Sequence, residues 1–177
     1  MGMSVRVIEA GAGVGGTWYW NRYPGARCDV ESVEYSYGFS EELQQQWQWS
    51  ERFAAQPEIL RYLEHVAERF GLYADIQLNT RVLAAHFDAQ AARWRVSTDD
   101  GNYNARFCVM ATGCLSSANR PDMPGLADYR GRVLYTSTWP HEEVSFAGQR
   151  VGLIGTGSSG VQATPEIAKQ AEHLYVF

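Results

Sequence analysis

The stretch Gly155-Thr156-Gly157-Ser158-Ser159-Gly160 decides the fold, because it matches the pattern G-x-G-x-x-G in the setting that this pattern requires. The run Arg150-Val151-Gly152-Leu153-Ile154 predicts a strand before it, and 161–171 predicts a helix after it. In such a turn the first glycine permits the tight bend, the second lets backbone approach a pyrophosphate, and the third lets helix and strand pack closely. The helix N-terminus attracts the phosphate charge. We therefore predict a dinucleotide-binding turn in a Rossmann-type unit, with a further strand over 174–177.

The alternative for this glycine turn is a strand–helix connection that binds nothing. The residue that distinguishes NAD from NADP lies about 20 residues beyond such a motif. That position is at or past Phe177, so the motif does not name the nucleotide.

A second match to the pattern, Gly11 to Gly16, follows a run over 5–8 that predicts a buried strand. The residues after it are rich in aromatics and proline, so we expect no helix, and no helix N-terminus facing a phosphate. Glu9 favours another interpretation, because an acidic residue at the end of the second Rossmann strand binds the adenosine ribose hydroxyls. Residues 5–9 would then be that second strand, with the first strand and its glycine turn outside this chain. A solvent-exposed loop carboxylate is the alternative.

Residues 17–39 follow neither a helical nor a strand period and are rich in Gly, Pro, Trp and Tyr. An irregular segment of this length is usually functional or disordered, and its large aromatic side chains argue against disorder. Together with the charges of Arg27 and Asp29, these rings suit a wall around a flat ring system. A surface cluster or a plug in the core is the alternative.

The pattern over 57–70 predicts a helix, with Pro57 in its first turn and Gly71 as its stop. The apolar side chains expected to share one face are Ile59, Leu63, Val66 and Phe70.

Three strand-like runs over 76–87, 94–97 and 105–111 predict a β-meander with a turn at 99–102. The continuously apolar end of the last run, 107–111, predicts a strand buried on both faces. Residues 116–148 are expected to be a loop-rich connector.

Composition excludes several classes of protein. Of 177 residues, 45% are hydrophobic and 20% charged, which is ordinary globular composition, and the net charge of -5 gives no basic surface for nucleic acid or an anionic membrane. We expect neither a membrane helix nor a secretory signal. The cysteines Cys28, Cys108 and Cys114 are odd in number and lack metal-ligand spacing, so we expect reduced thiols in a cytoplasmic protein and no metal. His141 is a weak catalytic candidate.

Taken together, these stretches resemble the Baeyer–Villiger monooxygenases, a branch of the flavin-containing monooxygenases. The aromatic stretch 15–29 is far more specific than either glycine motif. The other matching segments follow in order over nearly the whole chain: Glu31-Ser32, Tyr35-Ser36-Tyr37, 56–62, Ala111-Thr112-Gly113 and 155–160.

The fingerprint of this family, F-x-G-x-x-x-H-x-x-x-W-P, is matched in part by the connector. Its places are occupied by Tyr129, Gly131, Tyr135, Trp139 and Pro140. Tyr135 stands where the family has histidine, which removes an imidazole from the linker that couples cofactor binding to domain movement. This departure leaves open a related flavin monooxygenase that oxidises nitrogen or sulfur.

The resemblance implies an α/β fold of the FAD/NAD(P)-binding Rossmann type, with two dinucleotide-binding domains cut at both ends and a β-meander. Residues 1–115 would be a partial FAD-binding domain, 116–148 the linker and 149–177 the start of the NADPH-binding domain. It also implies a reaction: NADPH reduces FAD, O2 adds to give a C4a-peroxyflavin, and one oxygen atom enters a ketone to form an ester or lactone. The arginine that stabilises the peroxide would lie outside this chain, so we expect the chain alone to be inactive. A truncated, inactive nucleotide-binding protein is a further alternative, and the oligomeric state is open.

The resemblance also implies the site residues. Glu9 would bind the FAD ribose and Val82 the adenine side through its backbone, while Asp29 is the catalytic candidate, since a carboxylate beside the flavin can pair with an active-site arginine. Arg27, Cys28 and Asp29 would approach the nicotinamide. The residues expected along the flavin and its contacts are Gly16, Thr17, Trp18, Tyr19, Trp20, Asp29, Tyr35 and Gly113. Those expected to hold the NADPH pyrophosphate are Gly155, Thr156, Gly157, Ser158, Ser159, Gly160 and Val161.

Overall fold

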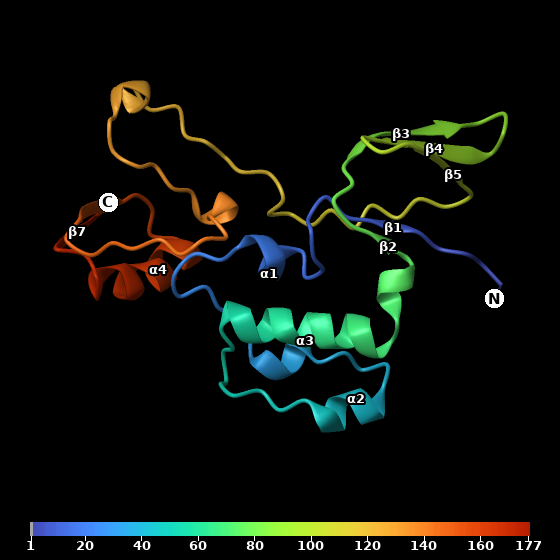
Figure 1. Ribbon diagram of the computed structural model, residues 1–177, viewed down its shortest axis with the longest axis horizontal. Helices are drawn as coiled ribbons and strands as arrows, with labels where there is room; N and C mark the ends of the chain where they lie inside the picture. Colours follow the sequence, from blue (N-terminus) through green and yellow to red (C-terminus); the bar gives the residue numbers. More distant parts are fainter. Residues whose placement is uncertain (1) are drawn as a thin grey trace.

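The computed structural model describes residues 2–177 and contains four α-helices and seven strands within them. In chain order the elements are β1 (Val7–Ile8), α1 (Thr17–Trp20), α2 (Glu41–Gln46), α3 (Gln56–Arg69), β2 (Ile76–Gln77), β3 (Val82–Asp88), β4 (Arg93–Thr98), β5 (Asn102–Ala105), β6 (Arg150–Leu153), α4 (Ser158–Ala168) and β7 (His173–Val176). Short 3-10 turns occupy Ser32–Tyr35, Leu72–Ala74, Leu126–Asp128 and Thr136–Thr138. Figure 1 shows α4 and β7 at one end, the β3–β5 sheet at the other, and α1 between them.

Helix α3 is the scaffold beneath α1, and it forms as the sequence predicts. Pro57 lies in its first turn, and Gly71 ends it in the left-handed conformation with a φ of 63°. Ile59 and Val66 are buried as expected. Phe70 is the exception on this face, because it stays 40% exposed and packs edge-on against Phe39 instead.

The predicted β-meander is the antiparallel sheet β3-β4-β5, with the expected turn between β4 and β5. Its third strand lies earlier than expected, because β5 covers Asn102–Ala105 and not 105–111. The first predicted run is two strands rather than one. Its beginning, β2, pairs in parallel with β1, and β3 starts only at Val82. The chain bends between them because the Asn79 and Thr80 N–H groups donate to the carbonyl oxygens of Gly11 and Glu9, each at 2.9 Å.

Two expectations of burial are wrong. Val5 and Val7, in the first predicted strand, are 60% and 47% exposed. β1 belongs to a sheet of only two short strands, which is too small to bury side chains on both faces. Residues 107–111 form no strand, and Val109 is 87% exposed. A strand buried on both faces needs hydrogen-bonding neighbours and covering helices, and no strand among residues 2–177 pairs with 107–111.

At the C-terminal end, β6, α4 and β7 form the predicted strand–turn–helix–strand unit, with β6 and β7 parallel. Helix α4 begins at Ser158, before the predicted residue 161, and ends at Ala168.

The connector 116–148 has only 3-10 turns, and its apolar residues join two distant parts of the chain. A buried cluster packs the connector against α4 and the aromatic segment. Its members are Tyr23, Ala26, Trp139, Val144, Phe146, Ala163 and Ile167. The early segment and the C-terminal unit therefore share one hydrophobic core.

Candidate functional site

An open cleft of about 550 Å³ lies beside the aromatic segment. Its volume is within the range of small-molecule sites. Thr17, Trp18 and Tyr35, all predicted to lie along a flavin, are among its lining residues. The others are Gly15, Glu34, Ser36, Tyr37, Leu63 and Leu115.

Two glycines position this wall. Gly15 has a φ of 117°, a backbone conformation that residues with a side chain rarely adopt, and a Cβ atom on it would lie 2.6 Å from Leu60 Cδ1 of α3, so this turn favours glycine. Gly16, with a φ of 50°, then caps α1. The expectation that no helix follows these glycines is wrong, because α1 is a single helical turn. Trp18 packs edge-on against Tyr35, with ring centroids 5.7 Å apart.

Tyr19 and Trp20 lie away from the lining of this cleft and contact the connector. Their ring centroids are 5.0 Å and 6.0 Å from that of His141, both in edge-on geometry. Burial, followed by the nearby charge of Arg22, lowers the pKa of His141. The Tyr19 hydroxyl also accepts a hydrogen bond from the Ala12 N–H at 3.2 Å. These rings therefore tie the first glycine loop to the connector.

Cys28 and Asp29 are neighbours with different environments. The Cys28 side chain is 3% exposed and packs with Ala54 and Ile59, so it lies in the core. Asp29 is exposed. Burial raises the pKa of Tyr35, and the charges of Cys28 and Asp29 raise it further. Asp29 is thus close enough to the cleft to act electrostatically on a residue that lines it.

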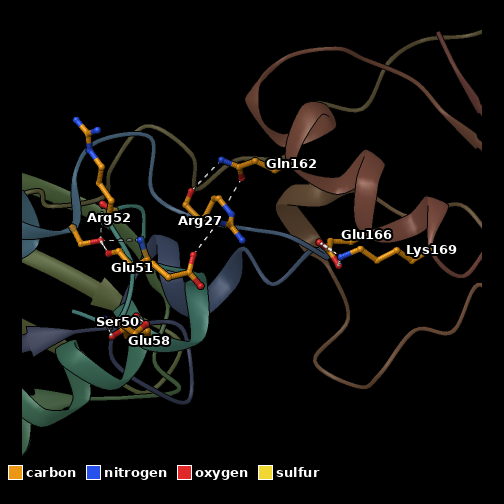
Figure 2. A network of polar contacts seen from close by, with 10 residues as sticks. Arg27, Ser50, Glu51, Arg52, Glu58, Gln162, Glu166 and Lys169 are labelled. Atoms are coloured by element: carbon orange, nitrogen blue, oxygen red, sulfur yellow. Dashed lines mark hydrogen bonds and ion pairs between the residues drawn. The ribbon is translucent and has the colours of Figure 1, made fainter. Parts of the chain in front are cut away.

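Gln162 on α4 connects the C-terminal unit to the aromatic segment. Its Oε1 accepts from the Tyr23 hydroxyl at 2.8 Å and from the Arg27 N–H at 3.3 Å. Its Nε2 donates to the Arg27 carbonyl at 3.2 Å and to Asp29 Oδ1 at 2.9 Å. Figure 2 shows Gln162 reaching to Arg27, whose guanidinium pairs with Glu51 at 3.3 Å.

The sequence analysis missed Gln162. A glutamine in the second turn of a helix carries no pattern of its own, and its partners are far away in the chain.

The C-terminal glycine turn has the geometry that its motif predicts. Gly155 has a φ of 109°. A Cβ atom on Gly160 would lie 2.1 Å from the Gly155 carbonyl oxygen, so the helix can approach the turn only with glycine there. A Cβ atom on Gly157 would meet nothing within 4 Å, so this side of the turn is open. No side chain caps the N-terminus of α4, and its first N–H groups are left for a ligand.

Three further predicted residues lie near the first glycine loop or the cleft. Glu9 is half-buried and its Oε1 accepts from the Gly11 N–H at 2.7 Å. Val82 is 45% exposed and begins β3, directly after the backbone that is bonded to Glu9. Gly113 is exposed with a φ of 67°, close in sequence to Leu115, which lines the cleft.

Across residues 2–177, no group of three or more His, Cys, Asp or Glu side chains is arranged to hold a metal ion. None of the helices described is both long enough and apolar enough to cross a membrane. The three cysteines are all free thiols.

Comparison with known proteins identifies relatives over nearly all of the chain. Acetone monooxygenase (methyl acetate-forming) of Gordonia sp. (strain TY-5) is 45% identical to this chain. The match covers 99% of this chain and 33% of the relative. Phenazine N-monooxygenase of Lysobacter antibioticus is 46% identical, over 100% of this chain and 33% of that relative. Among solved structures, an oxidized steroid monooxygenase bound to NADP matches with a TM-score of 0.93 and 59% sequence identity. This match covers 99% of this chain and 34% of the steroid monooxygenase chain.

The chain therefore spans about a third of the length of these relatives. The model of the family described as pyridine nucleotide-disulphide oxidoreductase matches residues 6–177. The expected α/β fold of FAD/NAD(P)-binding type is confirmed, and so is the likeness to the Baeyer–Villiger monooxygenases. The chain belongs to the pyridine nucleotide-disulphide oxidoreductase family, and it is similar to proteins named Baeyer–Villiger monooxygenase.

Proposed function

We propose that this chain supplies parts of the FAD and NADPH sites of a monooxygenase that inserts one oxygen atom from O2 into a ketone, giving an ester or lactone. The observation that carries the proposal is the contact between the aromatic segment and α4, the helix that follows the nucleotide-type glycine turn. Gln162 of α4 is hydrogen-bonded there to Arg27 and Asp29. A hydride donor and a flavin must meet at one place, and this contact brings the two candidate sites together.

The glycine turn fits NADPH. The open side at Gly157 admits a pyrophosphate, and the uncapped start of α4 offers N–H donors to it. Thr156, Ser158, Ser159 and Val161 would complete this cradle, and NADP in the related steroid monooxygenase supports the choice of nucleotide.

The cleft fits the flat ring of FAD. Trp18 and Tyr35 are aromatic residues that line it, and Thr17 adds a hydroxyl-bearing residue. Glu9 Oε1 is held by the Gly11 N–H, which orients the carboxylate that would bind the ribose. Gly16, Tyr19, Trp20, Val82 and Gly113 stay proposed contacts of the same cofactor.

The cofactors, when bound, supply hydride transfer and activation of O2. The chain's own residues would hold them and exclude water. Asp29 would place a negative charge between the flavin wall and the nicotinamide, where it can pair with an arginine of the complete enzyme. Arg27 would stand beside it, with its guanidinium balanced by Glu51. Cys28 would contribute through its backbone, because its side chain is in the core.

We also propose the division into a partial FAD-binding domain (1–115), a linker (116–148) and the start of the NADPH-binding domain (149–177). The partners would be a small ketone and O2, not nucleic acid. Three free thiols suit a reducing, cytoplasmic setting.

Oxygenation of nitrogen is the second candidate. It is supported by the phenazine N-monooxygenase, whose identity to this chain is as high as that of the acetone monooxygenase. Tyr135 at the histidine place of the fingerprint is the feature of this chain that fits it.

A chimera tests the proposal. Residues 6–177 would replace the corresponding segment of the steroid monooxygenase, which is 59% identical. We expect a yellow, FAD-containing protein that consumes NADPH and O2 and converts a ketone to its ester, with the unaltered host as control. A folded chimera that retains neither FAD nor NADPH oxidation would contradict the proposal. Phenazine N-oxide formed faster than by the host would favour the second candidate.

A further inference from the structure

The side chain of Gln162 uses all of its hydrogen-bonding groups on one segment. Its oxygen accepts from Tyr23 and Arg27, and its nitrogen donates both available protons, to Arg27 and Asp29. We propose that Gln162 is a positioning residue that fixes the Asp29 carboxylate to α4 and so keeps the flavin wall in register with the NADPH turn. This inference rests on the proposed function.

Only a carboxamide satisfies this arrangement. Two of the four partners are donors and two are acceptors, and a glutamine side chain offers an acceptor oxygen and a two-proton donor nitrogen at its tip. A carboxylate of the same shape keeps the two bonds from Tyr23 and Arg27. It loses the two donated bonds and places a second negative charge against Asp29, which repels it.

The backbone around this contact is built for close approach. Gly25 has a φ of 79°, and a Cβ atom there would lie 2.3 Å from the Gln162 carbonyl oxygen. Ala26 and Tyr23 pack in the same cluster as Ala163 and Ile167 of α4. The segment is therefore pressed against α4, and Gln162 is the polar contact that sets where Asp29 points.

The position of Gln162 on α4 links the proposed NADPH turn to Asp29. It follows the glycine turn on the helix whose N-terminus would hold the pyrophosphate. A shift of α4 on binding NADPH would be passed to the Asp29 carboxylate through the Gln162 side chain, which is bonded to it directly. Asp29 in turn acts on Tyr35 in the cleft.

The first test uses the chain itself and needs no cofactor. Amide hydrogen exchange would be measured by NMR on the wild type, Gln162→Ala and Gln162→Glu. We expect the Arg27 amide to exchange about tenfold faster in Gln162→Ala, because its acceptor is lost, and to stay near the wild type in Gln162→Glu. Gln170→Ala is the matched control, since Gln170 Oε1 accepts from the Phe146 N–H at 3.3 Å. In Gln170→Ala the Phe146 amide should exchange faster, and the exchange rate of the Arg27 amide should stay unchanged.

The second test uses the chimera. In Gln162→Glu we expect the rate of flavin reduction to fall about tenfold with little change in the KM for NADPH, because the two donated bonds are lost and the new carboxylate repels Asp29. Gln170→Ala should match the wild type in both parameters.

The outcomes separate the two proposals. A wild-type chimera without activity contradicts the proposed function, while the exchange data still decide whether Gln162 holds the segment. If the chimera is active and its Gln162→Glu variant reduces flavin as fast as its Gln170→Ala variant, the positioning role of Gln162 is overturned. This holds even if the Arg27 amide exchanges faster in Gln162→Ala. An Arg27 amide that is unaffected by Gln162→Ala overturns the inference altogether.

Discussion

Gly25 and Gln162 approach so closely that a Cβ atom on Gly25 would lie 2.3 Å from the Gln162 backbone carbonyl oxygen. Carbonyl oxygens cannot rotate aside as a flexible side chain can. The contact therefore demands glycine twice, once for space and once for a φ of 79°. It lies beside the hydrogen bonds of Gln162 and the buried cluster that also join the aromatic segment to the C-terminal unit.

Gly25→Ala should be strongly destabilising for this reason. We expect the free energy of unfolding in urea to fall by about 2–4 kcal/mol, from backbone strain and the clash together. Gly148→Ala is the control, because Gly148 has a similar φ of 68° with nothing within 4 Å of a Cβ atom, and should cost only about 1–2 kcal/mol. Equal losses in the two variants would show that the close contact has no energetic weight.

The glycines of the C-terminal turn should separate stability from binding. Gly160→Ala forces a Cβ atom to 2.1 Å from the Gly155 carbonyl oxygen and should lower stability by at least about 2 kcal/mol. Gly157→Ala meets open space in the protein, so the fold should persist while NADP+ binding weakens at least tenfold, measured by calorimetry on the chimera. Undiminished NADP+ binding by Gly157→Ala would place the pyrophosphate elsewhere.

The hydroxyl of Ser32 is buried and forms hydrogen bonds with the backbone of residues 51–54. It donates to the Glu51 carbonyl at 2.7 Å and accepts from the Ala54 N–H at 2.8 Å. Ser32→Ala leaves that buried N–H without an acceptor, so we expect a loss of about 1–3 kcal/mol in thermal or urea unfolding. Ser145→Ala, which removes an exposed hydroxyl, should change stability by less than about 0.5 kcal/mol. A Ser32→Ala protein as stable as the wild type would contradict this.

Tyr62 should make stability depend on alkaline pH. Its side chain is fully buried, its oxygen accepts from the Tyr37 N–H at 2.8 Å, and burial raises its pKa above the value of 10.0 expected when unfolded. The folded protein then holds this proton more tightly than the unfolded chain. The stabilisation is fully present below about pH 10 and is lost as the pH rises through the folded pKa.

Tyr62→Phe should therefore lose about 1 kcal/mol at pH 7, from the missing hydrogen bond, and show a shallower decline above pH 10. Urea unfolding between pH 7 and pH 11 measures both, with Tyr129→Phe as an exposed control. A decline as steep in Tyr62→Phe as in the wild type would assign the alkaline loss to other groups.

Patterns that depend on near neighbours were predicted correctly. Helix α3 has Pro57 at its start and Gly71 at its end, and both act on the backbone next to them. The turn at 99–102 and the glycine motif at 155–160 are equally local. The aromatic stretch 15–29 predicted both the family and a cleft-lining wall, although Tyr19 and Trp20 contact His141 instead of lining the cleft.

What failed depended on partners far along the chain. Apolar character predicted a buried strand at 107–111, yet hydrophobicity cannot supply the neighbouring strands that such burial needs. The break at 79–80 arises from bonds to Glu9 and Gly11, which no alternation of residues reveals.

The sequence by itself determined the glycine turn, the main helix, the meander and the family, because glycine, proline and hydrophobic periodicity act within a few residues of themselves. Only the tertiary structure decided that Gln162 forms hydrogen bonds with Arg27 and Asp29 and that the Cys28 side chain packs in the core. Those contacts join segments that meet only after the chain has packed, since hydrogen bonds and van der Waals contacts act over a few ångströms of space regardless of the distance along the chain.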